Sequence, residues 1–165
     1  MNKQGQIDLV TRYFAAVDGE DIDALLSTLT HDCVFTVETH GVRLEGLGEI
    51  TGMFRRLWDS HAAVLHHKFT FVPDSDGNRI AARFTVDNTE HDGSHTYKSN
   101  CNFFEISGDR FSAVAVYMTG VNTLDSYPTN AVPGAGCTDS TACNYDPEAT
   151  SDNGSCVDND VCGIC

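Results

Sequence analysis

The stretch RYFAAVDGEDIDALL, residues 12–26, decides the fold, because two helical patterns meet in it at a glycine and an aspartate. Before Gly19 the apolar residues recur in steps of three and four, the spacing of one helical face. These residues are Ile7, Val10, Phe14 and Val17. Asp21 is of a type that caps helix N-termini, and it precedes a second apolar face. The stretch therefore predicts two successive helices, with a break at Gly19.

Downstream, the pattern changes from helical spacing to strand alternation. β-branched and aromatic residues predict a strand over 33–37 with a short return strand over 42–44. A third helix is expected over 46–58. Turn residues then separate long alternating segments, which favours antiparallel strands. These segments lie around 67–71, 80–86, 97–106 and 111–118.

Helices gathered early and strands gathered late predict an α+β fold rather than a parallel α/β sheet. We expect a cone-shaped, curved antiparallel sheet whose concave face is packed with three N-terminal helices. Such an arrangement leaves a pocket between the layers.

The distribution of charged residues and cysteines along the sequence divides the chain into parts. All ten Lys and Arg and all seven His precede Ala131, whereas the remainder holds six acidic residues and five of the seven Cys. The join is rich in Pro, Gly and small residues, which is typical of a linker. The sequence predicts a domain over 1–125, a linker over 126–136 and an acidic, Cys-rich tail over 137–165.

The net charge of −14 would repel phosphate backbones and anionic lipid, so we expect neither nucleic acid nor a membrane as a partner. No apolar run approaches the ~18 residues of a membrane span. The opening residues, 1–6, lack the apolar segment of a signal peptide. These features favour a cytoplasmic location.

Three stretches, 12–26, 84–86 and 102–110, resemble the nuclear-transport-factor-2-like cone fold, especially its ketosteroid isomerase and SnoaL-like polyketide cyclase branch. The resemblance covers about residues 5–125. It implies a small hydrophobic ligand or substrate, no cofactor, and a homodimer formed through the sheet. The fold hosts enzymes and binding modules alike, so the resemblance does not choose between them.

Ketosteroid isomerases hold a developing oxyanion with a tyrosine on the first helix and an acid on a late strand. The matching residues are Tyr13 and Asn102, and an Asn amide donates at any pH. The isomerase base falls on Val37, which cannot accept a proton, and strand alternation turns Glu38 to the other face. We therefore do not expect ordinary steroid isomerisation. Tyr13 as a core-edge residue and Asn102 as a paired strand residue remain open.

Another base is implied by the dehydratases of the superfamily, scytalone dehydratase being the nearest type, which use histidines from neighbouring strands. His66 and His67 match the first such position, and Asp87 lies near the second. His67 shares strand parity with Phe69 and Phe71, so one histidine of the pair should face inward. A carboxylate beside it would fix its tautomer. Solvent-facing or merely packed side chains remain the alternative at these positions.

Apolar residues of the predicted elements would line the pocket or belong to the core. They are Phe14, Val37, Phe54, Trp58, Phe104, Val116 and Met118. The spacing of His, Cys, Asp and Glu in this domain does not indicate a tight metal site.

Three functions stay open. The first is a cofactor-free lyase or isomerase that acts on a small hydrophobic carbonyl compound by general acid–base catalysis. The second is a non-catalytic module for ligand binding or dimerisation. The third, an epoxide hydrolase, needs an Asp–Arg–Asp cluster, for which Arg83 and Asp87 share strand parity without a third member.

The tail, 137–165, resembles a short Cys-rich repeat of secreted and surface proteins of marine microbes, which implies an oxidising compartment and a longer natural product. Disulfides would stabilise a segment too small for its own core. Weaker alternatives are calcium at Asp152, Asn153, Asp158 and Asp160, and zinc at Cys162 and Cys165 with another pair of ligands. The tail and the N-terminus therefore predict different compartments.

Overall fold

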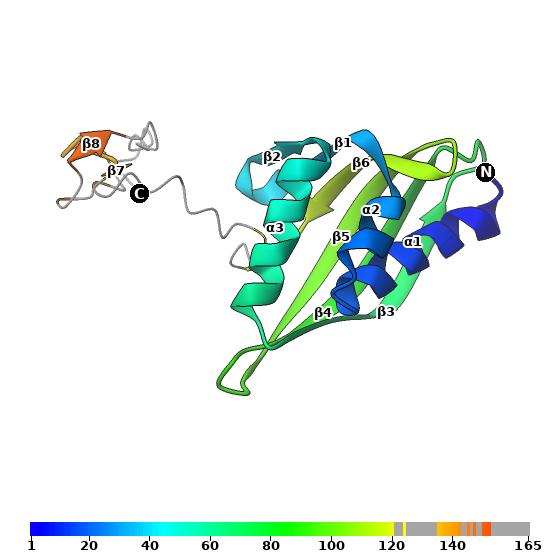
Figure 1. Ribbon diagram of the computed structural model, residues 1–165, viewed down its shortest axis with the longest axis horizontal. Coiled ribbons are helices and arrows are strands. Elements are labelled where there is room, and N and C mark those ends of the chain that lie inside the picture. Colours follow the sequence, from blue (N-terminus) through cyan, green and yellow to red (C-terminus); the bar gives the residue numbers. More distant parts are fainter. Residues whose placement is uncertain (121–123, 125–134, 143–144, 146, 148–149, 153–165) are drawn as a thin grey trace. The chain divides into compact units, whose positions relative to one another are not determined.

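The computed structural model describes residues 1–120, 124, 135–142, 145, 147 and 150–152 (Figure 1). The chain divides into two compact units, Met1–Ser126 and Tyr127–Cys165, and each is described by itself.

Three helices form in the first unit where the sequence predicts them. Helix α1 (Lys3–Asp18) begins at Asn2, whose side chain accepts a hydrogen bond from the Gly5 backbone N–H, and ends at Gly19. Helix α2 (Ile22–Ser27) is capped by Asp21, as expected, through the Ala24 N–H. Helix α3 (Gly46–Ser60) completes the set.

Six strands form one sheet in the order β2-β1-β6-β5-β4-β3. Neighbouring strands are antiparallel except β1 and β6, which run parallel. The strands are β1 (Leu29–Val37), β2 (Val42–Glu45), β3 (Ala63–Pro73), β4 (Arg79–Thr89), β5 (His95–Ser107) and β6 (Arg110–Tyr117). The predicted α+β architecture is confirmed. The parallel pair differs from the fully antiparallel sheet that the sequence predicts. It arises because β1 pairs with β6, the last of the four consecutive strands β3 to β6.

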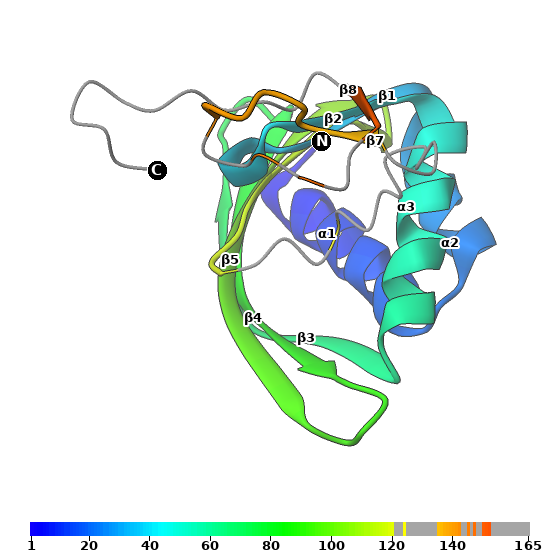
Figure 2. The ribbon, with the colours of Figure 1, turned by 90° about the vertical axis from the view of Figure 1, so that its left-hand side faces the viewer.

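The sheet curves around α1, so that the helices lie on its concave side (Figure 2). Helix α1 packs against β3 and β4, whereas α3 packs against β1 and β2. Inward positions alternate along each strand, as burial in β4 shows: every even-numbered residue from Ile80 to Asn88 is buried. The core therefore fills the space between the concave face and the helices.

A β-bulge in β3 exchanges the faces of this strand. The register against β4 shifts between His67 and Thr70, and Lys68 has a φ of 57°. Before the bulge His66 faces inward, and after it Phe69 and Phe71 pack against the core. Because of this one extra residue, even-numbered residues face the concave side before the bulge and odd-numbered residues face it after the bulge.

In the second unit, β7 (Ala135–Gly136) pairs in parallel with β8 (Ser151–Asp152). Cys137 is disulfide-bonded, and its partner lies outside the described residues. The remaining tail cysteines and most of the proposed calcium and zinc ligands also lie outside them. Among the residues described, none of the helices combines the length and the apolar character needed to cross a membrane.

Candidate active site

A cavity of about 40 Å³ lies between α1, α3 and the concave face of the sheet. This volume holds about three water molecules. Most of its wall is aromatic or aliphatic, and the polar members are one tyrosine, one histidine and three asparagines. The wall consists of Tyr13, Phe14, Val17, Phe35, Phe54, Leu57, Val64, His66, Phe84, Val86, Asn88, Asn100, Asn102, Val116, Met118 and Leu124.

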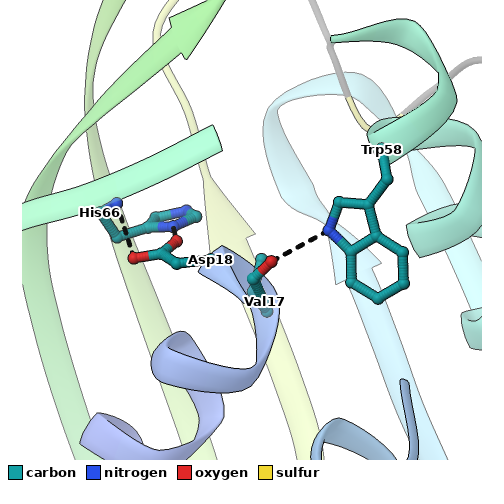
Figure 3. A network of polar contacts seen from close by, with 4 residues as sticks. All are labelled: Val17, Asp18, Trp58 and His66. Carbon is teal, nitrogen blue, oxygen red and sulfur yellow. Dashed lines mark hydrogen bonds and ion pairs between the residues drawn. The ribbon is translucent and has the colours of Figure 1, made fainter. Parts of the chain in front are cut away.

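His66 is bound to Asp18, the last residue of α1 (Figure 3). Its Nδ1 lies 2.5 Å from Oδ1 of Asp18, and its backbone N–H donates to Oδ2 at 3.0 Å. The two side chains are 9% and 19% exposed. Both carboxylate oxygens are thus engaged by one residue, which fixes the position of the carboxylate relative to the ring.

This contact sets the tautomer of His66. A carboxylate only accepts hydrogen bonds, so the neutral ring carries its proton on Nδ1 and leaves the lone pair on Nε2. The ring packs against Phe14 and Phe84, with centroid distances of 4.6 and 5.3 Å. A histidine that lines a cavity with its orientation fixed by Asp18 can act as a general base.

Trp58 of α3 holds the end of α1 that carries Asp18. Its indole Nε1–H donates to the Val17 carbonyl at 3.0 Å, at the C-terminal end of α1, where the backbone N–H of Glu20 donates to the same oxygen at 3.2 Å (Figure 3). The sequence predicts Trp58 in the pocket wall. In the structure it anchors α1 and packs on Phe54, and it is not among the lining residues.

The three asparagines lie at different distances from His66. His66 pairs across β3 and β4 with Val86, and Asn88 and Asn100 occupy the rows on either side of Val86. Same-face rows are about 7 Å apart. Asn102, the predicted donor, lines the cavity but lies one row further away than Asn100.

The amide of Asn100 is the best oriented of the three. Its Oδ1 accepts a hydrogen bond from the Thr119 backbone N–H at 3.3 Å, which leaves the NH₂ group to donate. The Oδ1 atoms of Asn88 and Asn102 are buried and accept no hydrogen bond from any described residue. Asn100 and Asn88 are therefore the amides best placed to bind an oxygen atom near His66.

Tyr13 lines the cavity as the sequence predicts, at 2% exposure. Its ring makes edge contacts with Phe14, Phe54, Phe104 and Phe111. Burial, aided by the nearby Cys33 thiol, raises the pKa of Tyr13 well above its ordinary value. The phenol is therefore a proton-bearing donor throughout the ordinary pH range.

The expected pair of His67 and Asp87 requires correction. The bulge turns His66 inward, so His67 lies on the outer face, opposite Thr85. Asp87 also faces outward, since the buried positions of β4 are the even-numbered ones, and it binds Nδ1 of His95 at 2.7 Å. Arg83 shares this outer face and is exposed, so the pair proposed for epoxide hydrolysis does not face the cavity.

Two further predicted wall residues belong to the core. Val37 and Phe104 are buried at 0% and 1% exposure but are not part of the cavity wall. Glu38 follows Val37 in a short 3₁₀ turn and is exposed, with its carboxylate accepting a hydrogen bond from Thr36. Strand β1 therefore directs no carboxylate into the cavity. Phe14, Phe54, Val116 and Met118 do line it.

Asp18, Asn88 and Asn100 were not among the residues predicted. One signal pointed to Asp18: a carboxylate in the last turn of a helix faces the negative end of the helix dipole, which is unfavourable without a compensating partner. Asn88 and Asn100 are polar residues at strand positions that share parity with buried apolar residues, and this pattern could have indicated that they face inward. Among the residues described, no group of three or more His, Cys, Asp or Glu side chains could hold a metal ion.

Fold and site together define a small α+β cone domain with a mostly apolar internal cavity. The chain belongs to the SnoaL-like domain family, which matches residues 10–114. None of the curated proteins matches it.

Solved structures with this fold include three that differ in their described roles. A candidate polyketide cyclase from Xanthomonas campestris is 22% identical, with a TM-score of 0.65 over 71% of this chain and 92% of that one. SalBIII, an epoxide hydrolase/cyclase-like enzyme, is 15% identical, with a TM-score of 0.64 over 72% and 93%. An NTF2-like protein of unknown function from Burkholderia pseudomallei is 17% identical, with a TM-score of 0.62 over 72% and 92%. At these identities the likeness shows the fold alone.

Proposed function

We propose that this domain is a cofactor-free lyase, isomerase or cyclase that removes a proton from the carbon next to a carbonyl group in a small hydrophobic compound. The Asp18–His66 pair at the wall of an apolar cavity carries the proposal. The cyclase names of some structural neighbours support this reaction class.

In the proposed step, Nε2 of His66 takes the proton from the α-carbon. The electron pair of the broken C–H bond forms the carbon–carbon double bond of an enolate, and the negative charge moves to the carbonyl oxygen. The amide of Asn100 or Asn88 donates a hydrogen bond to this oxygen, and Asp18 stabilises the imidazolium ion that forms. The enolate then expels a β-substituent, is reprotonated by His66 at another carbon, or attacks a second carbonyl of the same molecule.

Exchange of carbon-bound hydrogen tests the first half of this step. Small ketones are incubated with the full chain in D₂O, and loss of the α-proton signal is followed by NMR. General-base catalysis contributes about 10²- to 10⁴-fold, so His66→Asn should lower the exchange rate by at least about a hundredfold. Asp18→Asn should lower it by about tenfold or more, because the tautomer and the imidazolium lose their support.

The chain contains a matched control. His95 and Asp87 form a second His–Asp contact on the outer face of the sheet, so His95→Asn should leave the exchange rate unchanged. Ketones that bind without any exchange, or exchange that His66→Asn and His95→Asn reduce equally, would contradict the proposal. Binding without exchange would favour the non-catalytic ligand-binding module.

A further inference from the structure

Asn88 is a buried residue of the cavity wall whose amide oxygen lacks a hydrogen bond. It lies on the inward face of β4, is 1% exposed and lines the cavity. Its Oδ1 accepts no hydrogen bond from any described residue. A buried polar atom without a partner destabilises a fold, so its presence calls for an explanation. A bound molecule that donates a hydrogen bond to this oxygen would supply one.

The amide of Asn100 differs from that of Asn88 in this respect. The Thr119 backbone N–H donates to Oδ1 of Asn100 at 3.3 Å, so this oxygen is occupied and the NH₂ group remains to donate. An enolate oxygen accepts hydrogen bonds and donates none, which suits Asn100. The unoccupied Oδ1 of Asn88 instead requires a group that carries a hydrogen, and a hydroxyl group is the simplest such group.

The strand register places Asn88 beside the proposed base. Asn88 of β4 pairs with Val64 of β3, which lies two residues before His66, and all three line the cavity. Diagonal neighbours of this kind on adjacent strands are about 7–8 Å apart, within reach of long side chains. Asn100 lies one strand further on, in the row on the other side of His66. The row of His66 therefore lies between those of the two asparagines.

We propose that Asn88 binds a hydroxyl group of the substrate, so that the domain acts on β-hydroxy ketones rather than on simple ketones. The order of the three rows matches the order of the three groups in such a molecule. The hydroxyl group lies at Asn88, the α-carbon at His66 and the carbonyl oxygen at Asn100. The inference rests on the proposed function, since it names the substrate class of the same cavity.

This placement assigns the enolate one fate, the expulsion of its β-substituent. After Nε2 of His66 has taken the α-proton, the enolate restores its carbon–oxygen double bond, and an electron pair forms a double bond between the α- and β-carbons. The bond from the β-carbon to the hydroxyl oxygen breaks, and its electron pair stays on that oxygen. The oxygen takes the proton back from His66, which yields an unsaturated ketone and water. The hydroxyl group becomes a stronger donor as it gains this proton, so Oδ1 of Asn88 favours its departure.

The test compares two ligands of nearly the same shape. Diacetone alcohol is a β-hydroxy ketone, and methyl neopentyl ketone has a methyl group in place of the hydroxyl. Dissociation constants of both ligands for the full chain are measured by NMR titration, and their ratio cancels the contacts that the two ligands share. A hydrogen bond between neutral groups contributes about 1 kcal/mol, which corresponds to about fivefold in this ratio.

Asn88→Leu should shift the ratio toward methyl neopentyl ketone by about fivefold, because leucine keeps the shape of asparagine and removes its amide. Asn102→Leu is the matched comparison and should keep the wild-type ratio. Oδ1 of Asn102 is likewise buried without a partner among the described residues, but it lies two rows from His66. If Asn88→Leu does not fold, as judged by circular dichroism, Asn88→Ala takes its place. A ratio that the Asn88 variants leave unchanged, or one that shifts in Asn102→Leu instead, would overturn the proposal.

Failure of this inference and failure of the proposed function give different results. The wild-type chain should convert diacetone alcohol to mesityl oxide, its dehydration product, and His66→Asn should lose this conversion and α-proton exchange but keep the affinity ratio. Exchange on both ligands, with a ratio that does not depend on Asn88, would remove the role of Asn88 and leave the base in place. An Asn88-dependent ratio without exchange would remove the chemistry and leave a binding site for hydroxy ketones. Exchange without mesityl oxide would overturn the assigned expulsion of the hydroxyl group.

Discussion

Asp18 is the residue whose position most needs an explanation. It ends α1, where the helix dipole is negative and a carboxylate is disfavoured. Two hydrogen bonds from His66 compensate for this placement. Residues that break a local rule and are compensated by a specific partner are expected at functional sites.

Tyr13 and Cys33 make folding stability sensitive to alkaline pH. Burial, with the charge of Asp32, raises the pKa of Cys33 to about 12, and burial raises that of Tyr13 well above its ordinary value. Unfolded Cys and Tyr release their protons near pH 8.5 and 10, so above these values the unfolded chain binds fewer protons than the folded chain. Stability should therefore fall as pH rises above about 9.

Urea unfolding between pH 7 and 11 measures this effect. Tyr13→Phe should remove up to about 1.4 kcal/mol per pH unit of the slope above about pH 10, the limit for one group. Tyr97→Phe, at an exposed tyrosine, serves as the control. A slope that Tyr13→Phe leaves unchanged would mean that the Tyr13 phenol ionises in the folded protein.

At the scale of elements, α3 acts on the site through α1. The hydrogen bond from Trp58 to Val17 joins the two helices next to Asp18. Trp58→Phe keeps an aromatic ring and removes the N–H, so it should lower stability by about 1 kcal/mol. We also expect it to loosen Asp18 and to lower kcat for α-proton exchange several-fold with little change in KM.

The low-field proton NMR signal of the His66 Nδ1–H reports directly on the positioning of Asp18. Trp58→Phe should shift or broaden this signal. Ser60→Ala, which removes a hydrogen bond at the exposed end of the same helix, should not. An unaltered signal in Trp58→Phe would limit Trp58 to a structural role.

The element order was predictable from the sequence, whereas the residues of the site were only partly so. Apolar spacing and turn residues located three helices and the strands, and α1 ends at Gly19 as predicted. Alternation predicts that one histidine of the pair faces inward and favours His67 through its shared parity with Phe69, and it does not reveal the bulge at Lys68, which has no Gly or Pro to mark it. The Asp18 contact joins residues 48 positions apart, a pairing that local patterns cannot supply.

At the scale of the whole molecule, the outer face of the sheet exposes several large apolar side chains. Five large apolar or aromatic side chains on it are between 43% and 65% exposed: Leu65, Val72, Tyr97, Phe103 and Tyr117. The rings of Phe103 and Tyr117 meet edge to face at 5.7 Å. Exposed apolar surface of this kind marks association sites, and it supports the homodimer that the family resemblance implies.

We expect a homodimer through this face, and Phe103→Asp should leave the chain monomeric, because a charge would be buried at that proposed interface without a partner. Sedimentation equilibrium measures the mass of each variant. Tyr145→Ser changes an exposed aromatic residue of the second unit and should leave the mass unaltered. A wild-type chain that sediments as a monomer would contradict the prediction.

The bulge at Lys68 also governs how this strand can change in length. Between His67 and Thr70, β3 contains one residue more than the opposing segment of β4. Loss of Lys68 would restore regular pairing and keep both His66 and Phe69 on the concave side. Deletion of a residue in β3 before His66 or after Phe69 would instead shift the register of that part of the strand by one residue. Its side chains would then move from one face of the sheet to the other. Descendants of this sequence should therefore tolerate a deletion at Lys68, whereas a deletion elsewhere in β3 should abolish the proposed reaction without any substitution at the site.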